Sequence, residues 1–244
     1  MKTASALFAT VLFLAGCQTA SNVCTDTPAA IPAKPAAPVL TSYEAYALLP
    51  QAEQQRLIAS ELRMIGTAIK TYAKAHDGKW PTSLSALIAE DFLPAGALIS
   101  SADPSRGREG GVPDSYDTWQ QSSETDEAGS SYLYEFSGAT ANWDWKSYLA
   151  GKPSVADADT DRSGEVSWAE AKAWQLARGD TAQATAGPYA KNRFPVVRCY
   201  WYVYPTAKDD TSLRSVISLA ADLETVILSQ PWWEKDSAPA VLLP

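Results

Sequence analysis

The segment 159–170 places oxygen-bearing side chains at fixed intervals around one glycine. An EF-hand calcium loop needs oxygen ligands at positions 1, 3 and 5, glycine at 6 and a backbone carbonyl at 7, followed by a small polar residue at 9 and a bidentate acid at 12. A count that starts at Asp159 meets every requirement, whereas a count from Asp157 puts Arg162 at the glycine position and fails. The predicted calcium ligands are Asp159, Asp161, Ser163, the carbonyl of Glu165, Ser167 and Glu170.

The loop chemistry predicts a weak, structural calcium ion. Calcium takes six to eight oxygen ligands, and Gly164 permits the sharp turn that brings them together. Serine replaces aspartate at position 5, and Gly151 and Pro153 interrupt the helix that should enter the loop. The helix that leaves the loop is expected over Trp168–Arg178. A single unpaired loop of this kind binds calcium at roughly 10⁻⁴–10⁻³ M, as extracellular modules do. The alternative is an acidic surface loop whose spacing arose by chance.

Motifs for catalysis are scarce, so we expect no enzyme. His76 is the only histidine and falls where a helix should end. The chain has no Gly-x-Ser-x-Gly, His-Glu-x-x-His or phosphate-binding loop. A hydrolase that uses a pair of carboxylates remains an alternative, because acidic residues are plentiful.

Tryptophan is abundant, with nine residues in the chain. Exposed indoles near a calcium site would suit carbohydrate binding, because indole stacks on the apolar face of a sugar ring. The opposing interpretation is that these side chains fill the core. The tryptophans concerned are Trp143, Trp145, Trp168, Trp174, Trp232 and Trp233.

The first residues are typical of a secretory leader. Lys2 precedes an uncharged apolar run over residues 6–15, which is shorter than the roughly 20 residues of a membrane span. Leu14-Ala15-Gly16-Cys17 resembles the lipobox of bacterial lipoproteins. That resemblance implies a signal peptide over residues 1–16, lipid on Cys17 and attachment to a membrane. Gln18, where inner-membrane retention uses aspartate, implies the outer membrane over the inner one, with the protein on the periplasmic face of the envelope.

The region after the lipidation site differs from the rest in composition. Residues 17–40 are rich in Ala, Thr and Pro, which predicts an extended linker. The chain carries a formal net charge of −8, which opposes nucleic-acid binding. Partners are therefore expected to be an envelope protein or a glycan. Cys24 and Cys199 are candidates for a disulfide in an oxidising compartment, although Cys199 lies in an apolar run and is also a candidate for simple burial.

Hydrophobic periodicity predicts an α+β domain over residues 41–244. Thr41 and Glu44 have capping-box spacing, and Pro50 precedes a long amphipathic helix that ends at Asp77-Gly78. Its apolar stripe, expected to face the core, is Ile58, Leu62, Ile65, Ile69 and Tyr72. A shorter helix follows Ser83, and residues 103–130 are expected to form an exposed loop.

Strands are predicted in the second half of the chain. The expected strands cover 132–136, 196–204, 216–219 and 225–228, the last two as a hairpin around Ala221-Asp222. They should form a small antiparallel sheet beneath the long helix. Residues 138–192 fall between two strands and are predicted to be an insertion that carries the calcium loop.

The exit of the long helix resembles that of pseudopilins of the type II secretion class. The resemblance begins in the run from Leu62 to Leu84. Within this run, Asp77-Gly78-Lys79-Trp80-Pro81 matches the Asp/Asn-Gly-x-Tyr/Trp-Pro segment of that family, which a short helix follows.

The resemblance extends to later segments and covers about half of the chain after the leader. Ala102-Asp103-Pro104 resembles the Asp-Pro segment that follows in that family, and the segments Phe194–Cys199 and Trp233-Glu234 resemble its sheet. The resemblance implies a pseudopilin-like fold. It does not imply pilus assembly, because a lipobox and a proline-rich linker stand where pseudopilins have a hydrophobic N-terminal helix.

Overall fold

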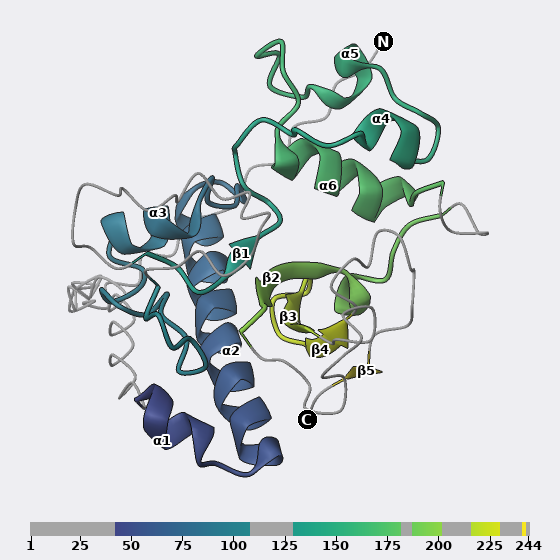
Figure 1. The fold of residues 1–244 in the computed structure, drawn as a ribbon. Helices are drawn as coiled ribbons and strands as arrows, with labels where there is room; N and C mark the ends of the chain where they lie inside the picture. The colour runs from purple at the N-terminus through teal and green to yellow at the C-terminus, as the bar shows by residue number, and fades with distance from the viewer. Residues whose placement is uncertain (1–41, 108–128, 182–186, 202–215, 230–240, 243–244) are drawn as a thin grey trace, which may run out of the picture. The chain divides into compact units, whose positions relative to one another are not determined.

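The computed structural model describes residues 42–107, 129–181, 187–201, 216–229 and 241–242, all of them within one compact unit, Lys34–Pro244. The fold is mixed α+β, as the sequence predicts, with helices and an antiparallel sheet (Figure 1). The predicted signal peptide, Cys17, Cys24 and the linker lie outside the described residues. No helix in the described part of the chain has the length and apolarity needed to cross a membrane.

The first helix, α1 (Tyr43–Ala47), begins one residue later than the predicted capping box requires. Ser42 is its N-cap, and the Ser42 hydroxyl accepts a hydrogen bond from the Ala45 amide at 3.2 Å. The prediction that Thr41 and Glu44 form this cap is therefore wrong. Both Ser42 and Thr41 have a suitable hydroxyl, so residue type alone does not distinguish them.

The long helix, α2 (Gln51–Ala75), begins after Pro50 and ends where two residues adopt left-handed backbone angles. Asp77 has φ 53° and Gly78 has φ 84°, and the Gly78 amide donates to the Ala73 carbonyl at 2.7 Å. This hydrogen bond satisfies a carbonyl that the helix end would otherwise leave unpaired. Helix α3 (Leu84–Ala89) follows, capped by Ser83.

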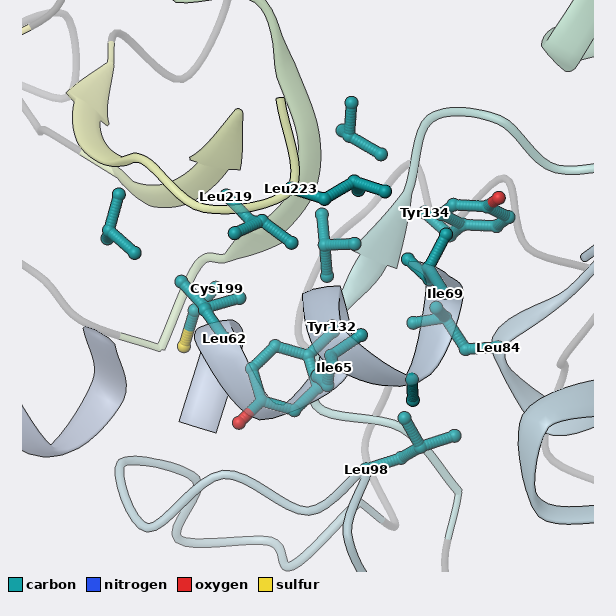
Figure 2. Packing of buried hydrophobic residues seen from close by; sticks show 14 of the residues in the cluster. Leu62, Ile65, Ile69, Leu84, Leu98, Tyr132, Tyr134, Cys199, Leu219 and Leu223 are labelled. Atoms are coloured by element: carbon teal, nitrogen blue, oxygen red, sulfur yellow. The ribbon is translucent and has the colours of Figure 1, made fainter. Parts of the chain in front are cut away.

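One face of α2 forms the centre of the main apolar cluster. Ile58, Leu62, Ile65 and Ile69 are completely buried, while Tyr72 is partly exposed. In Figure 2, Leu62, Ile65 and Ile69 gather with Leu219 and Leu223, which belong to the sheet and its hairpin turn. Each fully buried aliphatic side chain contributes about 1.5–3 kcal/mol to folding, so this face is the main attachment of the helix to the sheet.

The sheet is antiparallel and its strands follow chain order. Strand β1 pairs with β2, β2 with β3, β3 with β4, and β4 with β5. The predicted hairpin is present as β3 and β4, but β1 is shorter than the predicted strand 132–136. The strands are β1 (Leu133–Tyr134), β2 (Pro195–Cys199), β3 (Val216–Ala220), β4 (Val226–Ser229) and β5 (Val241–Leu242).

The segment between β1 and β2 carries a second apolar cluster. Its helices are α4 (Trp145–Tyr148), α5 (Val155–Ala158) and α6 (Trp168–Arg178), and a 3₁₀ turn, η1 (Lys191–Arg193), precedes β2. This second cluster consists of Trp145, Leu149, Ala158, Val166 and Ala171. Helix α6 also contacts the main cluster, through Ala169 and Leu176.

The loop predicted to be exposed over residues 103–130 is buried at its beginning. Asp103 is only 1% exposed, and its carboxylate accepts hydrogen bonds from Ser105, Gly107 and Ser131. Residues 108–128 lie outside the described residues. Asp103 is buried because hydrogen-bond donors from Ser105 and Gly107, and from Ser131 much later in the chain, surround its carboxylate; hydropathy does not report such donors.

The close approach of α2 to the sheet leads to a prediction about Gly66. A Cβ atom at Gly66 would lie 2.6 Å from the Leu223 carbonyl oxygen and 3.0 Å from Leu219 Cδ2. We expect Gly66→Ala to lower the free energy of unfolding by about 1–3 kcal/mol, measured by chemical denaturation, although alanine favours helix. Ser60→Ala, at an exposed site of α2, is the control. A Gly66→Ala protein as stable as the parent would contradict this packing.

The turn of the β3–β4 hairpin leads to a prediction about pH. Asp222 accepts hydrogen bonds from the Glu224 and Thr225 amides, at 3.0 and 2.8 Å, and from the Thr225 hydroxyl. Burial raises the pKa of Asp222, but these bonds and nearby Lys70 outweigh it, so the pKa lies below its ordinary value of 3.8. The folded state therefore favours the ionised carboxylate.

We expect Asp222→Ala to destabilise the protein by up to about 1 kcal/mol at pH 7. Because the folded-state pKa is lowered, the contribution of Asp222 is complete above the unfolded-state pKa and is lost as pH falls through the folded-state pKa. The difference between parent and variant should therefore begin to shrink below about pH 4 and disappear only once the pH is below the folded-state pKa. A difference that stays constant as the solution is acidified well below that point would argue against a role for the ionised group.

Candidate metal site

The predicted calcium loop lies between two capped helices. The entering helix, α5, is a single turn whose N-cap is Ser154, and Asp159 is its C-terminal cap. The exiting helix, α6, covers Trp168–Arg178 as predicted, with Ser167 as N-cap and Glu170 completing a capping box. The structure therefore places the first and last predicted ligands at the ends of two helices that flank one loop.

Three of the predicted ligands come together. Carboxylate oxygens of Asp159, Asp161 and Glu170 all lie within 4.8 Å of one another. In the described part of the chain, this is the one group of three or more side chains that could together hold a metal ion. Backbone angles in the left-handed region at Arg162 (φ 61°) and Gly164 (φ 92°) turn the loop tightly enough for this. Glycine adopts such angles without the steric cost that a Cβ atom brings.

Hydrogen bonds to the backbone hold the start of the loop. Asp159 accepts from the Ser163 and Gly164 amides at 3.0 and 2.8 Å, and Asp161 accepts from the Ser163 amide at 2.9 Å. The Ser163 hydroxyl donates to the Glu165 carbonyl oxygen at 3.0 Å, so the oxygens predicted for positions 5 and 7 are neighbours. A carboxylate has about four acceptor sites, so Asp159 retains acceptor capacity for a cation.

Glu170 is engaged by protein donors at both oxygens. Its Oε1 accepts from the Thr160 amide at 2.6 Å, the Thr160 hydroxyl at 2.7 Å and the Asp161 amide at 3.2 Å. Its Oε2 accepts from the Ser167 amide and hydroxyl, both at 2.9 Å. A cation bound by both oxygens of Glu170 would have to replace some of these hydrogen bonds. Ser167 is also engaged, because it is the N-cap of α6.

These contacts also keep Glu170 ionised. Burial raises the pKa of Glu170, but the hydrogen bonds from Ser167 and Thr160 outweigh burial and place the pKa below its ordinary value. The donor set is chemically suited to a hard cation, since it consists of carboxylate, hydroxyl and carbonyl oxygens. The loop contains four acidic residues and one basic residue, Arg162, so a cation would relieve repulsion among the acids.

The exit of the loop forms an antiparallel bridge with a segment outside it. Thr140 and Ser167 form an antiparallel bridge, in which the Ala141 amide donates to the Val166 carbonyl and the Trp168 amide donates to the Ala139 carbonyl, both at 2.8 Å. The Thr140 hydroxyl also donates to Glu165 Oε2 at 2.7 Å. Residues 139–141 therefore support the exit of the loop.

Sequence reasoning missed a buried charge network beside the loop. Glu135 Oε2 lies 3.2 Å from Lys172 Nζ, and Glu135 Oε1 lies 2.5 Å from Arg198 Nε. Lys172 and Arg198 are completely buried, and Glu135 is 2% exposed. Arg198 could have been noticed as a charge inside an apolar strand, but the sequence does not show that Lys172 and Glu135 reach it.

The other predicted groups are distributed through the fold. Cys199 is buried, with Sγ 3.7 Å from Ser100 Oγ, and its proposed partner Cys24 is outside the described residues. His76 caps α2 and pairs with Glu90 at 2.8 Å. Trp145 and Trp168 are buried, Trp143 and Trp174 are partly buried, and Trp232 and Trp233 are not described.

A buried carboxylate in the main cluster is also occupied by protein donors. Glu61 accepts hydrogen bonds from the Ser100 hydroxyl, the Ser101 amide and hydroxyl, and the Tyr132 hydroxyl. Burial, together with the charge of Glu61, holds the pKa of Tyr132 well above its usual value, so the phenol stays protonated and donates. This arrangement explains how a carboxylate is accommodated inside an apolar cluster.

Comparisons with protein-family models, with curated proteins and with solved structures find no significant match to this chain.

Proposed function

We propose that this chain is a non-catalytic, calcium-binding envelope lipoprotein that acts as an interaction or assembly module. The observation that carries the proposal is the convergence of the Asp159, Asp161 and Glu170 carboxylates within 4.8 Å, in the register that the loop motif requires. Calcium, when bound, would supply a positive charge that holds these acids together. Asp159, Asp161, Ser163, the Glu165 carbonyl, Ser167 and Glu170 would hold the ion, and Ser167 also caps α6.

The proposed location follows from the leader. The run Leu14–Cys17 supports lipid attachment at Cys17, and the linker over residues 17–40 would separate the folded domain from the bilayer. Gln18 favours the outer membrane. An envelope protein or a glycan is the proposed partner class, since the acidic chain disfavours nucleic acid.

The finer architecture of the proposed module is a pseudopilin-like domain with an insertion. Helix α2, which ends at Asp77-Gly78 and packs on the β3–β4 hairpin, resembles the arrangement expected of a pseudopilin-like domain. The segment that contains α4, α5 and α6 would then be an insertion into that domain, stiffened by calcium. A domain of this kind on a lipid anchor has the parts of a tethered interaction module.

The first test of calcium binding is Glu170→Gln. Calorimetric titration of the full chain in detergent micelles should give one site per chain, with an affinity in the roughly 10⁻⁴–10⁻³ M range. We expect Glu170→Gln to weaken binding at least about tenfold, because the bidentate anion is lost. Glutamine still completes a capping box, so the variant tests ligation rather than the start of α6.

The matched control is Glu165→Gln in the same loop. It removes the same charge, but position 7 contributes only its backbone carbonyl, so calcium affinity should change by less than about threefold. Equal weakening by the two substitutions would indicate a diffuse charge effect and would reject the proposed register. Absence of binding heat at several millimolar calcium would reject the site itself.

The anchor is tested by Cys17→Ser. The parent protein should incorporate radiolabelled fatty acid and sediment with membranes, whereas Cys17→Ser should lose the label and remain with the soluble fraction, because the thiol that carries the lipid is absent. Cys24→Ser removes the next cysteine and should keep both properties. Label retained in the Cys17→Ser protein would disprove lipidation at this residue.

A further inference from the structure

The geometry points to Lys172, Glu135 and Arg198 as a buried link through which calcium in the loop stabilises the sheet. This inference rests on the calcium site proposed above and concerns what that site regulates. Its basis is a set of contacts outside the acidic loop.

The first part of the link is the position of Lys172 on α6. Glu170, the closing ligand, lies in the first turn of α6, and Lys172 follows two residues later with a completely buried side chain. The Ala169 amide, one residue before Glu170, donates to the Ser137 carbonyl at 2.9 Å. The start of α6 is therefore attached to the chain that leaves β1, and a displacement of this turn would move both Glu170 and Lys172.

The second part is the bridge that Glu135 makes between α6 and the sheet. Its two oxygens contact different cations, Lys172 at 3.2 Å and Arg198 at 2.5 Å. Arg198 belongs to β2, where it stands opposite Leu133 of β1 and Ser218 of β3. One carboxylate thus connects the exiting helix of the loop to β2, a strand that is paired on both sides.

The third part is the charge balance, which makes separation costly. Two cations share one carboxylate, and aromatic faces support one of them, because Lys172 Nζ lies 5.2 Å from the Trp143 ring centre and 5.5 Å from that of Trp168. Separation of Lys172 from Glu135 gives up the attraction between two oppositely charged groups in a low-dielectric interior, while Glu135 keeps its second cation, Arg198. If α6 moves away from the sheet, Glu135 loses one cation and Lys172 loses its carboxylate.

The consequence is that opening of α6 and opening of the sheet are coupled. Calcium bound through Glu170 lowers the population of states in which α6 is detached. Those states also leave Glu135 held to the sheet by Arg198 alone, so the sheet becomes more protected when their population falls. Linkage gives the size of the effect, since a ligand that binds only the closed state reduces opening by the factor 1 + [ligand]/Kd.

The test is hydrogen exchange of the hairpin amides, residues 216–229, in the full chain with and without calcium. At a calcium concentration about ten times the dissociation constant, exchange of these amides should slow about tenfold. Calorimetry on the same sample measures binding separately. Binding heat with unchanged hairpin exchange would overturn the link and leave the site standing, whereas no heat would overturn both.

Substitutions at Lys172 identify the route. Lys172→Met keeps an unbranched apolar stem and leaves Glu135 paired with Arg198, so calcium should still bind while its effect on hairpin exchange falls below about twofold. Lys146→Met, which removes an exposed cation on α4, should leave the tenfold effect intact. Lys172→Arg keeps the cation and should restore the coupling. A Lys172→Met protein in which calcium still slows hairpin exchange about tenfold would disprove this route. If a variant does not fold, the exchange measurement on the unsubstituted chain still decides whether calcium protects the hairpin.

Discussion

The buried carboxylate of Glu135 connects helix α6 to strand β2. On one side it contacts Lys172 of α6, and on the other it contacts Arg198 of β2. Helix α6 contributes Ala171 to the smaller cluster and packs Ala169 against the main one, so the ion network crosses the boundary between them. Buried charges tolerate little displacement, because each loses its compensation when a partner moves. Glu135 therefore contributes to holding α6, which carries Glu170, against the sheet.

Apolar packing sets the frame within which this network forms. The buried face of α2 fixes the hairpin at Gly66, where the Leu223 carbonyl leaves no room for a side chain. The sheet then places Arg198 in the interior, and the end of β1 places Glu135 beside it. The network adds orientation to a domain whose stability comes mainly from burial of aliphatic side chains.

The acids of the candidate metal site repel one another, but hydrogen bonds within the loop and a bridge to residues 139–141 hold them in place. Backbone amides hold Asp159 and Asp161, and both oxygens of Glu170 are held by protein donors. The bridge between Thr140 and Ser167 compensates for the one-turn entering helix α5. Contacts within the protein alone bring the acids together, which reduces the conformational ordering that cation binding would require. Against this, Glu170 would have to exchange some of its hydrogen bonds for metal bonds, which would lower the affinity for a cation.

Local chemistry in the sequence determined the mixed α+β class, the bounds of α6, the stop of α2 at Asp77-Gly78, the β3–β4 hairpin and the convergence of Asp159, Asp161 and Glu170. Each follows from periodicity, turn preference or ligand spacing over a few residues, which adjacent side chains largely set. The sequence alone does not decide between Thr41 and Ser42 as a cap, because both residues present a hydroxyl. The burial of Asp103, the pairing of residues 139–141 with the loop and the contact of Lys172, Glu135 and Arg198 required the tertiary structure. Those features join residues far apart in the chain, and the cost of burying a charge is known only when its partners are in place.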